Sequence, residues 1–179
     1  RSRGATGTPP SARVAVYDAG YVFGRNRWAP FSTASFYTLR FGATRAIHGH
    51  HDHGSLTWYA RGHPILIDTG HVGYETGPRR EHVRSREAHN VLVAPGLAAR
   101  NADSTLVRAA TTPRVDVFEV SVPGYVGATW RRTALIVSSD MDAMVVYDRL
   151  PTRQAKTTSQ YWHLPPGTTV TVGRGRADA

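Results

Sequence analysis

Residues 114–122 read RVDVFEVSV, a run rich in β-branched side chains and free of glycine and proline. Such a composition is typical of a β-strand. The valines alternate with Asp116 and Glu119, apart from a slip near Phe118. Alternation with a period of two predicts a strand buried on one face, and an extra residue at the slip would form a β-bulge. The stretch therefore predicts a half-buried strand whose valines face the core.

Nine more runs of this kind occur along the chain, separated by Gly, Pro, Asp and Asn. They cover residues 13–17, 35–41, 55–60, 64–68, 90–94, 133–138, 143–148, 159–164 and 168–172. No window places apolar residues at helical spacing between capping residues. The sequence therefore predicts an all-β fold, an antiparallel β-sandwich of ten or more strands with few or no helices.

Two hairpins are visible in the pattern of turn residues. YARGHP (59–64) and VSSDMDAM (137–144) each place turn-forming residues between two apolar runs. The run AMVVYD (143–148) is apolar almost throughout, which predicts a strand covered on both faces.

Length and composition restrict the class of protein. The 179 residues predict a single domain, 1–179. The absence of cysteine excludes disulfides and thiolate metal sites, so any metal must be bound by His, Asp or Glu. No apolar run reaches membrane-spanning length, and residues 1–10 lack the apolar core of a signal peptide. We expect no membrane span, and a secreted, periplasmic or cell-envelope location is compatible with this composition.

The charge of the chain is positive and comes almost wholly from arginine. Lys and Arg number 22 against 13 acidic residues, a net charge of +9, and Lys156 is the only lysine. Arginine makes planar, bidentate contacts with carboxylate, sulfate and phosphate. The charge therefore favours a polyanionic partner. An acidic polysaccharide is the expected one, because no motif of a nucleic-acid-binding protein accompanies the charge.

Histidines are concentrated in one part of the chain. Eight of the nine lie between His48 and His89, and four of them stand in IHGHHDHGS (47–55). Such a cluster indicates metal ligands, an acid/base site, or solvated strand ends. HGHHDH also matches the metal-binding pattern of the metallo-β-lactamase fold, which we keep as an alternative. The segment after it reads as strand, turn and strand, whereas that fold requires a helix.

A wider match covers residues 36–96, about a third of the chain. HGHHDHGS is followed by a strand, then by ILIDTG (65–70), a tyrosine and RSREAHN (84–90). This ordered set resembles the signature of the heparinase II/III-like polysaccharide lyases. The resemblance implies that the chain is the C-terminal β-sandwich of a larger lyase, whose N-terminal α/α toroid packs against it and is absent here.

The resemblance also implies a metal site. In that family a zinc ion, regarded as structural, is bound by residues that match His50, Asp68 and His89. Two imidazoles and a carboxylate would leave a fourth tetrahedral position for water. Asp52 and Asn90 would then orient the ligand imidazoles from the second layer.

The catalytic residues implied by the resemblance are His48 and Tyr74, which would face the substrate cleft. Three arginines between Tyr74 and His89 would bind the anionic groups of the sugar; they are Arg80, Arg84 and Arg86. The implied reaction is β-elimination in a uronic-acid-containing polysaccharide, of the alginate or glycosaminoglycan type. Because part of the acid/base set would lie in the toroid, we expect the isolated segment to be inactive or nearly so.

A non-catalytic sandwich that binds acidic glycans is the competing interpretation. In such a module exposed aromatic side chains would stack on sugar rings. The candidates are Trp28, Trp58 and Trp130.

Overall fold

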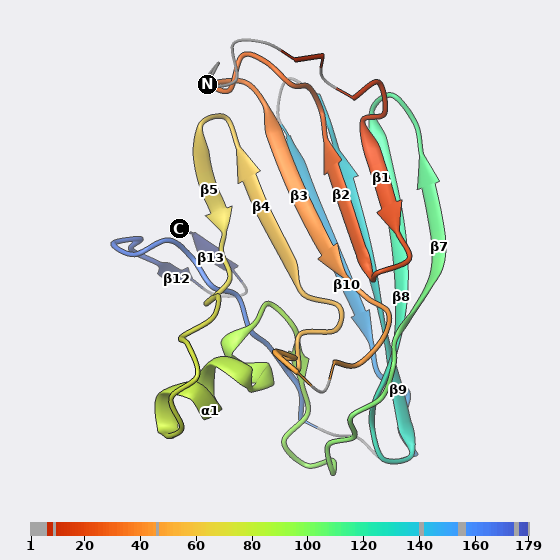
Figure 1. Ribbon diagram of the computed structural model, residues 1–179, viewed down its shortest axis with the longest axis vertical. Helices are drawn as coiled ribbons and strands as arrows, with labels where there is room; N and C mark the ends of the chain where they lie inside the picture. The colour runs from red at the N-terminus through yellow and green to blue at the C-terminus, as the bar shows by residue number, and fades with distance from the viewer. Residues whose placement is uncertain are drawn as a thin grey trace.

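Two antiparallel sheets face each other across an apolar core (Figure 1). The computed structural model describes residues 7–8, 10–45, 47–139, 142–153, 157–173 and 176–178. The predicted all-β sandwich is confirmed, with one short helix and one 3₁₀ turn among these residues. None of their helices has the length and apolar character needed to cross a membrane.

The first sheet is a meander in which each strand pairs with the next along the chain. Its order is β1-β2-β3-β4-β5. The strands are β1 (Val14–Tyr17), β2 (Tyr21–Arg25), β3 (Ser35–Arg40), β4 (Leu56–Ala60) and β5 (His63–Leu66). The predicted hairpin at 59–64 is the β4–β5 turn, where Arg61 and Gly62 both have positive φ. Glycine is tolerated there without a steric penalty.

The second sheet has the order β10-β9-β8-β7 and covers the other side of the core. Its strands are β7 (Thr105–Thr111), β8 (Val115–Tyr125), β9 (Ala128–Val137) and β10 (Ala143–Arg149). The hairpin predicted at 137–144 joins β9 to β10, although residues 140–141 within it lie outside the described residues.

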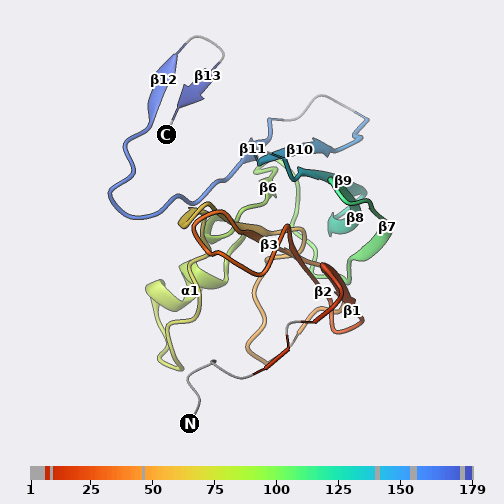
Figure 2. The ribbon, with the colours of Figure 1, turned by 90° about the horizontal axis from the view of Figure 1, so that it is seen from above.

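Short elements surround the two sheets (Figure 2). Strand β6 (Leu92–Val93) pairs with β11 (Ser159–Gln160), and β12 (Thr171–Gly173) pairs with β13 (Arg176–Asp178). The helical elements are α1 (Pro78–Arg84) and η1 (Arg86–Ala88). The alternation of strand and helix that a metallo-β-lactamase fold requires is not found in the described chain, so that alternative is wrong.

The first half of strand β8 faces the core in the opposite sense to the prediction, whereas Val120 and Val122 are buried as predicted. Asp116 and Phe118 are fully buried, and Val115 and Val117 are only partly buried. No register shift lies at Phe118; the pairing shifts between Val122 and Tyr125 of β8 against β9, and between Leu106 and Arg108 of β7 against β8. The valine pattern therefore misled the prediction, because a carboxylate occupies an inward position.

Asp116 is tolerated at a buried position because both of its carboxylate oxygens accept hydrogen bonds. It accepts hydrogen bonds from Arg13 Nη1 at 2.6 Å and from the Tyr37 hydroxyl at 2.7 Å. Burial, followed by the hydrogen bond to Asp116, raises the pKa of Tyr37 above its ordinary value. The group bridges the two sheets, since Tyr37 belongs to β3 and Asp116 to β8.

Strand β10 is an edge strand, not a strand covered on both faces. Val145 and Tyr147 on its outer face are 55% and 63% exposed. Strands β2 and β7 were not predicted. Gly24 weakens the pattern of the former, where it makes room for the Tyr37 ring, and β7 is exposed along most of its length.

The buried triad predicts the effect of a substitution on stability. Asp116→Ala should lower the free energy of unfolding by about 3 kcal/mol, because it leaves a buried hydroxyl and a guanidinium unpaired. Glu119→Ala, on the outer face of the same strand, removes an exposed ion pair with Arg131 and should cost less than about 1 kcal/mol. Urea unfolding measures both. Equal losses would contradict a bridging role for Asp116.

Candidate metal and substrate site

The site is formed at one end of the sandwich by two segments that contact each other. One is the β3–β4 connection, residues 41–55, and the other is residues 67–91, which follow β5 and contain α1 (Figure 1). The His51 N–H donates to the Arg84 carbonyl at 2.9 Å, and Arg84 Nε donates to the Gly49 carbonyl at 3.1 Å. These bonds hold the histidine-rich loop against the end of the helix.

The three predicted metal ligands lie together. His89 is fully buried, and its Nδ1 is 2.8 Å from Asp68 Oδ2. The His50 ring lies beside the His89 ring, with centroids 5.2 Å apart. Burial lowers the pKa of His50, and the neighbouring His89 lowers it further. Burial would raise the pKa of Asp68, but the hydrogen bond from His89 and the Gly70 N–H together bring it below its usual value.

The donor atoms fit a divalent ion with one adjustment. A carboxylate only accepts hydrogen bonds, so His89 Nδ1 carries the proton that it donates to Asp68, and Nε2 is the ring nitrogen that could present a lone pair to a metal ion. That Nε2 is buried and has no hydrogen-bond partner. Asp68 Oδ2 is bonded to Nδ1, on the side of the ring away from Nε2, so Asp68 must leave this hydrogen bond to become a ligand of an ion bound at Nε2. As placed, no three His, Cys, Asp or Glu side chains of the described residues converge closely enough to bind a metal.

His48 and Tyr74 form an exposed pair next to these residues. The Tyr74 hydroxyl is 3.5 Å from His48 Nε2, and the two rings meet edge to face. His48 has a φ of 56°, in the left-handed region that few residues other than glycine adopt. His71, which the prediction missed, packs edge-on against both rings and stacks on His50. The site thus has an outer pair and an inner cluster joined by His71.

Asn90 supports the inner cluster through the backbone. It is fully buried, and its Nδ2 donates to the carbonyls of Leu56 at 2.7 Å and Ile67 at 2.8 Å. Its Oδ1 accepts from the His163 N–H at 2.6 Å. Asn90 therefore positions the backbone beside Asp68; it does not bond to the ligand imidazoles.

Asp52 is placed differently from the prediction. Its carboxylate lies 3.7 Å from Arg40 Nε, and Arg40 is itself buried. Among the described residues Asp52 makes no side-chain hydrogen bond to an imidazole. Asp52 therefore lies beside Arg40, at the end of β3 where the histidine-rich loop begins.

The three predicted substrate-binding arginines have different surroundings. Arg84 is exposed and contacts the histidine loop, and Arg80 donates to the Gly73 carbonyl. Arg86 is bonded to the backbone of other segments: its Nη2 donates to the carbonyls of Arg100 and Gly124, and its guanidinium lies over the Tyr125 ring. Arg86 therefore bonds to the protein's own backbone in this structure.

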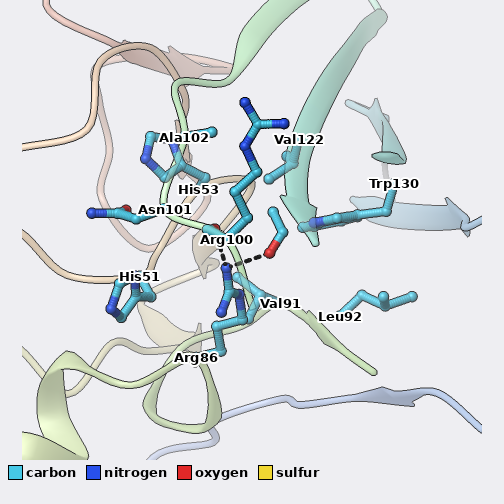
Figure 3. Close-up of a pocket in the computed structure, with 11 residues that line it drawn as sticks. His51, His53, Arg86, Val91, Leu92, Arg100, Asn101, Ala102, Val122 and Trp130 are labelled. Atoms are coloured by element: carbon cyan, nitrogen blue, oxygen red, sulfur yellow. Dashed lines mark hydrogen bonds between the residues drawn. The ribbon is translucent and has the colours of Figure 1, made fainter. Parts of the chain in front are cut away.

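Arg86 borders a small pocket behind the site, also lined by His51, His53 and Trp130 (Figure 3). Its volume of about 10 Å³ would admit roughly one water molecule. Trp130 is 1% exposed, which removes it from the candidate sugar-stacking residues. Trp58 is half-buried against the core, and Trp28 lies under Arg25.

Comparison with known proteins agrees with this architecture. The sequence matches the family described as heparinase II/III-like, C-terminal, over residues 8–179. The fold is similar to that of the heparan sulfate lyase HepC from Pedobacter heparinus, with a TM-score of 0.84 and 18% identity over 97% of this chain. A structure titled heparinase III is similar with a TM-score of 0.75 and 19% identity over 93% of this chain.

The matched structures are much longer than this chain. The chain spans 28% of the HepC chain and 27% of the heparinase III chain. No curated protein sequence is similar enough to be recognised as a relative.

The position of Asn90 generates a prediction. Asn90→Ala should lower the free energy of unfolding by about 2–3 kcal/mol, because two buried carbonyls lose their donor. Asn101→Ala, at an exposed position, should change it by less than about 0.5 kcal/mol. Thermal and urea unfolding compare the two, and a loss for Asn90→Ala no larger than that of the control would show that the side chain does not hold the backbone.

Proposed function

The chain belongs to the heparinase II/III-like C-terminal family, and on that premise we propose that it is the β-sandwich of a polysaccharide lyase. The substrate is a uronic-acid-containing anionic polysaccharide, of the glycosaminoglycan or alginate type. The lyase similar to it in fold acts on heparan sulfate. In the full-length protein the sandwich forms one wall of the cleft, and an N-terminal α/α toroid forms the other.

The observation that carries this proposal is the exposed pair of His48 and Tyr74. In β-elimination a base removes the proton next to the uronate carboxylate, the bond to the leaving oxygen breaks, a double bond forms and the oxygen is protonated. A phenol and an imidazole 3.5 Å apart at the surface are groups able to move those protons. The toroid completes the set, so the isolated sandwich is inactive or nearly so.

Neutralisation of the uronate carboxylate is the second requirement. The proton to be removed is far too weakly acidic while the neighbouring carboxylate keeps its full charge. Arg84 is exposed, and its Nε bond to Gly49 holds it beside the loop that carries His48. We assign Arg84 to binding the carboxylate, and Arg80 to holding the segment that carries Tyr74.

We further propose that zinc is bound by His50, Asp68 and His89. The partnerless Nε2 of His89 and the His50 ring beside it support this assignment. The ion, when bound, supplies a cross-link between three segments of the chain. The His71 ring contacts His50 on one side and His48 and Tyr74 on the other, so it links the proposed metal ligands to the exposed pair.

His48→Ala in the full-length protein should lower kcat by about a hundredfold or more, the usual contribution of a positioned acid or base. Its zinc content should stay unchanged. His63→Ala, an exposed histidine on β5, is the matched control and should retain full activity. Absorbance of the unsaturated product measures turnover. Wild-type turnover by the His48 variant would remove this residue from the mechanism and favour a non-catalytic glycan-binding module.

Asp68→Ala should lower both the zinc content and the Tm, the latter by about 5 °C or more. His50→Ala should lower the zinc content with a smaller effect on Tm, because Asp68 also accepts hydrogen bonds from His89 and from the Gly70 N–H. Asp18→Ala, in the exposed β1–β2 turn, is the control for both. Elemental analysis of the purified proteins measures the metal. One zinc per chain in both variants would contradict the ligand assignment.

A further inference from the structure

The outer face of the first sheet carries a file of aromatic rings. Tyr21 and Phe23 point outward from β2 because Val22 between them is fully buried. Their ring centroids are 5.8 Å apart with planes at 15°, and the Phe36 ring on β3 continues the file, 6.2 Å from Phe23 at 12°. Phe23 is 36% exposed, and no helix or strand of the described chain lies over this face (Figure 1).

An arginine stands at each end of the file. The Arg25 guanidinium carbon is 3.4 Å from the centroid of the Trp28 ring and 5.1 Å from that of Phe36. At the other end Arg45 lies 5.7 Å from the centroid of Tyr21. We call this set the aromatic strip; it consists of Arg45, Tyr21, Phe23, Phe36, Arg25 and Trp28.

The chemistry of this face is unlike that of a face packed on a protein core. Its outward positions on β2, β3 and β4 carry only aromatic, arginine and threonine side chains, with no aliphatic residue. The Arg25 guanidinium has no hydrogen-bond or ion-pair partner among the described residues, so its donors are available to an anion. The face therefore offers flat apolar rings and free cationic donors at the same time.

One end of the strip adjoins the histidine site. Arg45 precedes His48 by three residues, and the loop folds back so tightly that a Cβ at Gly49 would lie 1.9 Å from the Arg45 carbonyl oxygen. The other end, with Arg25 and Trp28, lies at the opposite end of β2. The strip thus extends from the candidate cleft along the length of a strand.

We propose that the aromatic strip is an extended binding surface for the acidic polysaccharide, outside the cleavage site. This inference rests on the proposed function. Sugar rings present C–H groups that stack on the negative faces of aromatic rings, and the sulfate or carboxylate groups between them meet the arginine forks. A long chain that occupies the cleft would extend past Arg45 onto the rings, whereas a short oligosaccharide would fill the cleft alone.

The test uses the full-length protein and two double variants of matched design. Phe23→Ala with Arg25→Ala removes an aromatic and an arginine two residues apart on the strip. Tyr147→Ala with Arg149→Ala removes the same kind of pair from the exposed outer face of β10 on the other sheet. Turnover of a long acidic polymer and of a tetrasaccharide from the same polymer gives KM and kcat for each protein.

The strip variant should raise KM for the polymer about tenfold and leave kcat unchanged. Its KM for the tetrasaccharide should remain that of the wild type, and the control variant should resemble the wild type on both substrates. Equal KM values for wild type and strip variant on the polymer would overturn the inference while the proposed function stands. Absence of turnover by the wild type on every acidic polymer would overturn the proposed function itself.

A third outcome identifies a different occupant of the strip. If another part of the polypeptide covers this face, the strip variant should lose thermal stability well beyond the loss of the control, and KM should change equally for polymer and tetrasaccharide. That result would also overturn the inference.

Discussion

The buried amide of Asn90 is the constraint on which the site depends. A buried polar group must be hydrogen-bonded. The Asn90 amide donates to the carbonyls of Leu56, at the start of β4, and Ile67, just after β5, and it accepts from the N–H of His163. Its own carbonyl accepts a bond from Arg132 of β9, which is 1% exposed. Arg132 in turn makes a bidentate pair with Asp148 of β10. Both sheets are therefore fixed relative to the segment that carries His89.

The candidate site residues lie in successive layers between Asn90 and the surface. His89 precedes Asn90 and bonds to Asp68, which follows Ile67, so the Asn90 contacts set the positions of two candidate ligands at once. His50 and His71 lie beyond them, and His48 with Tyr74 reach solvent. Buried and solvated imidazoles thus lie a few ångströms apart, which suits a structural ion inside and proton transfer at the surface.

The sequence predicted the fold class, because strand alternation is a local signal. The ligand set His50, Asp68 and His89 was implied by the family resemblance alone; the structure places Asp68 and His50 beside His89, and whether they share an ion stays a prediction. The sequence did not predict that Asp116 points inward from the first half of β8, since Asp116 is stabilised by Arg13 and Tyr37, which are distant in sequence. It also assigned Arg86 to substrate, although a lone arginine gives no sign that Gly124 and Arg100 carbonyls will take its donors. His71 was missed because its partners meet only through the folded loop.

The proposed zinc site requires one divalent cation where the loop before β4, the end of β5 and the segment before β6 meet. Anomalous diffraction from crystals of the zinc-containing protein, recorded on both sides of the zinc edge, tests it most directly. The account predicts a single peak per chain about 2.1 Å from imidazole nitrogens of His50 and His89. A peak elsewhere, or a zinc-free site in protein purified with zinc present, would contradict it.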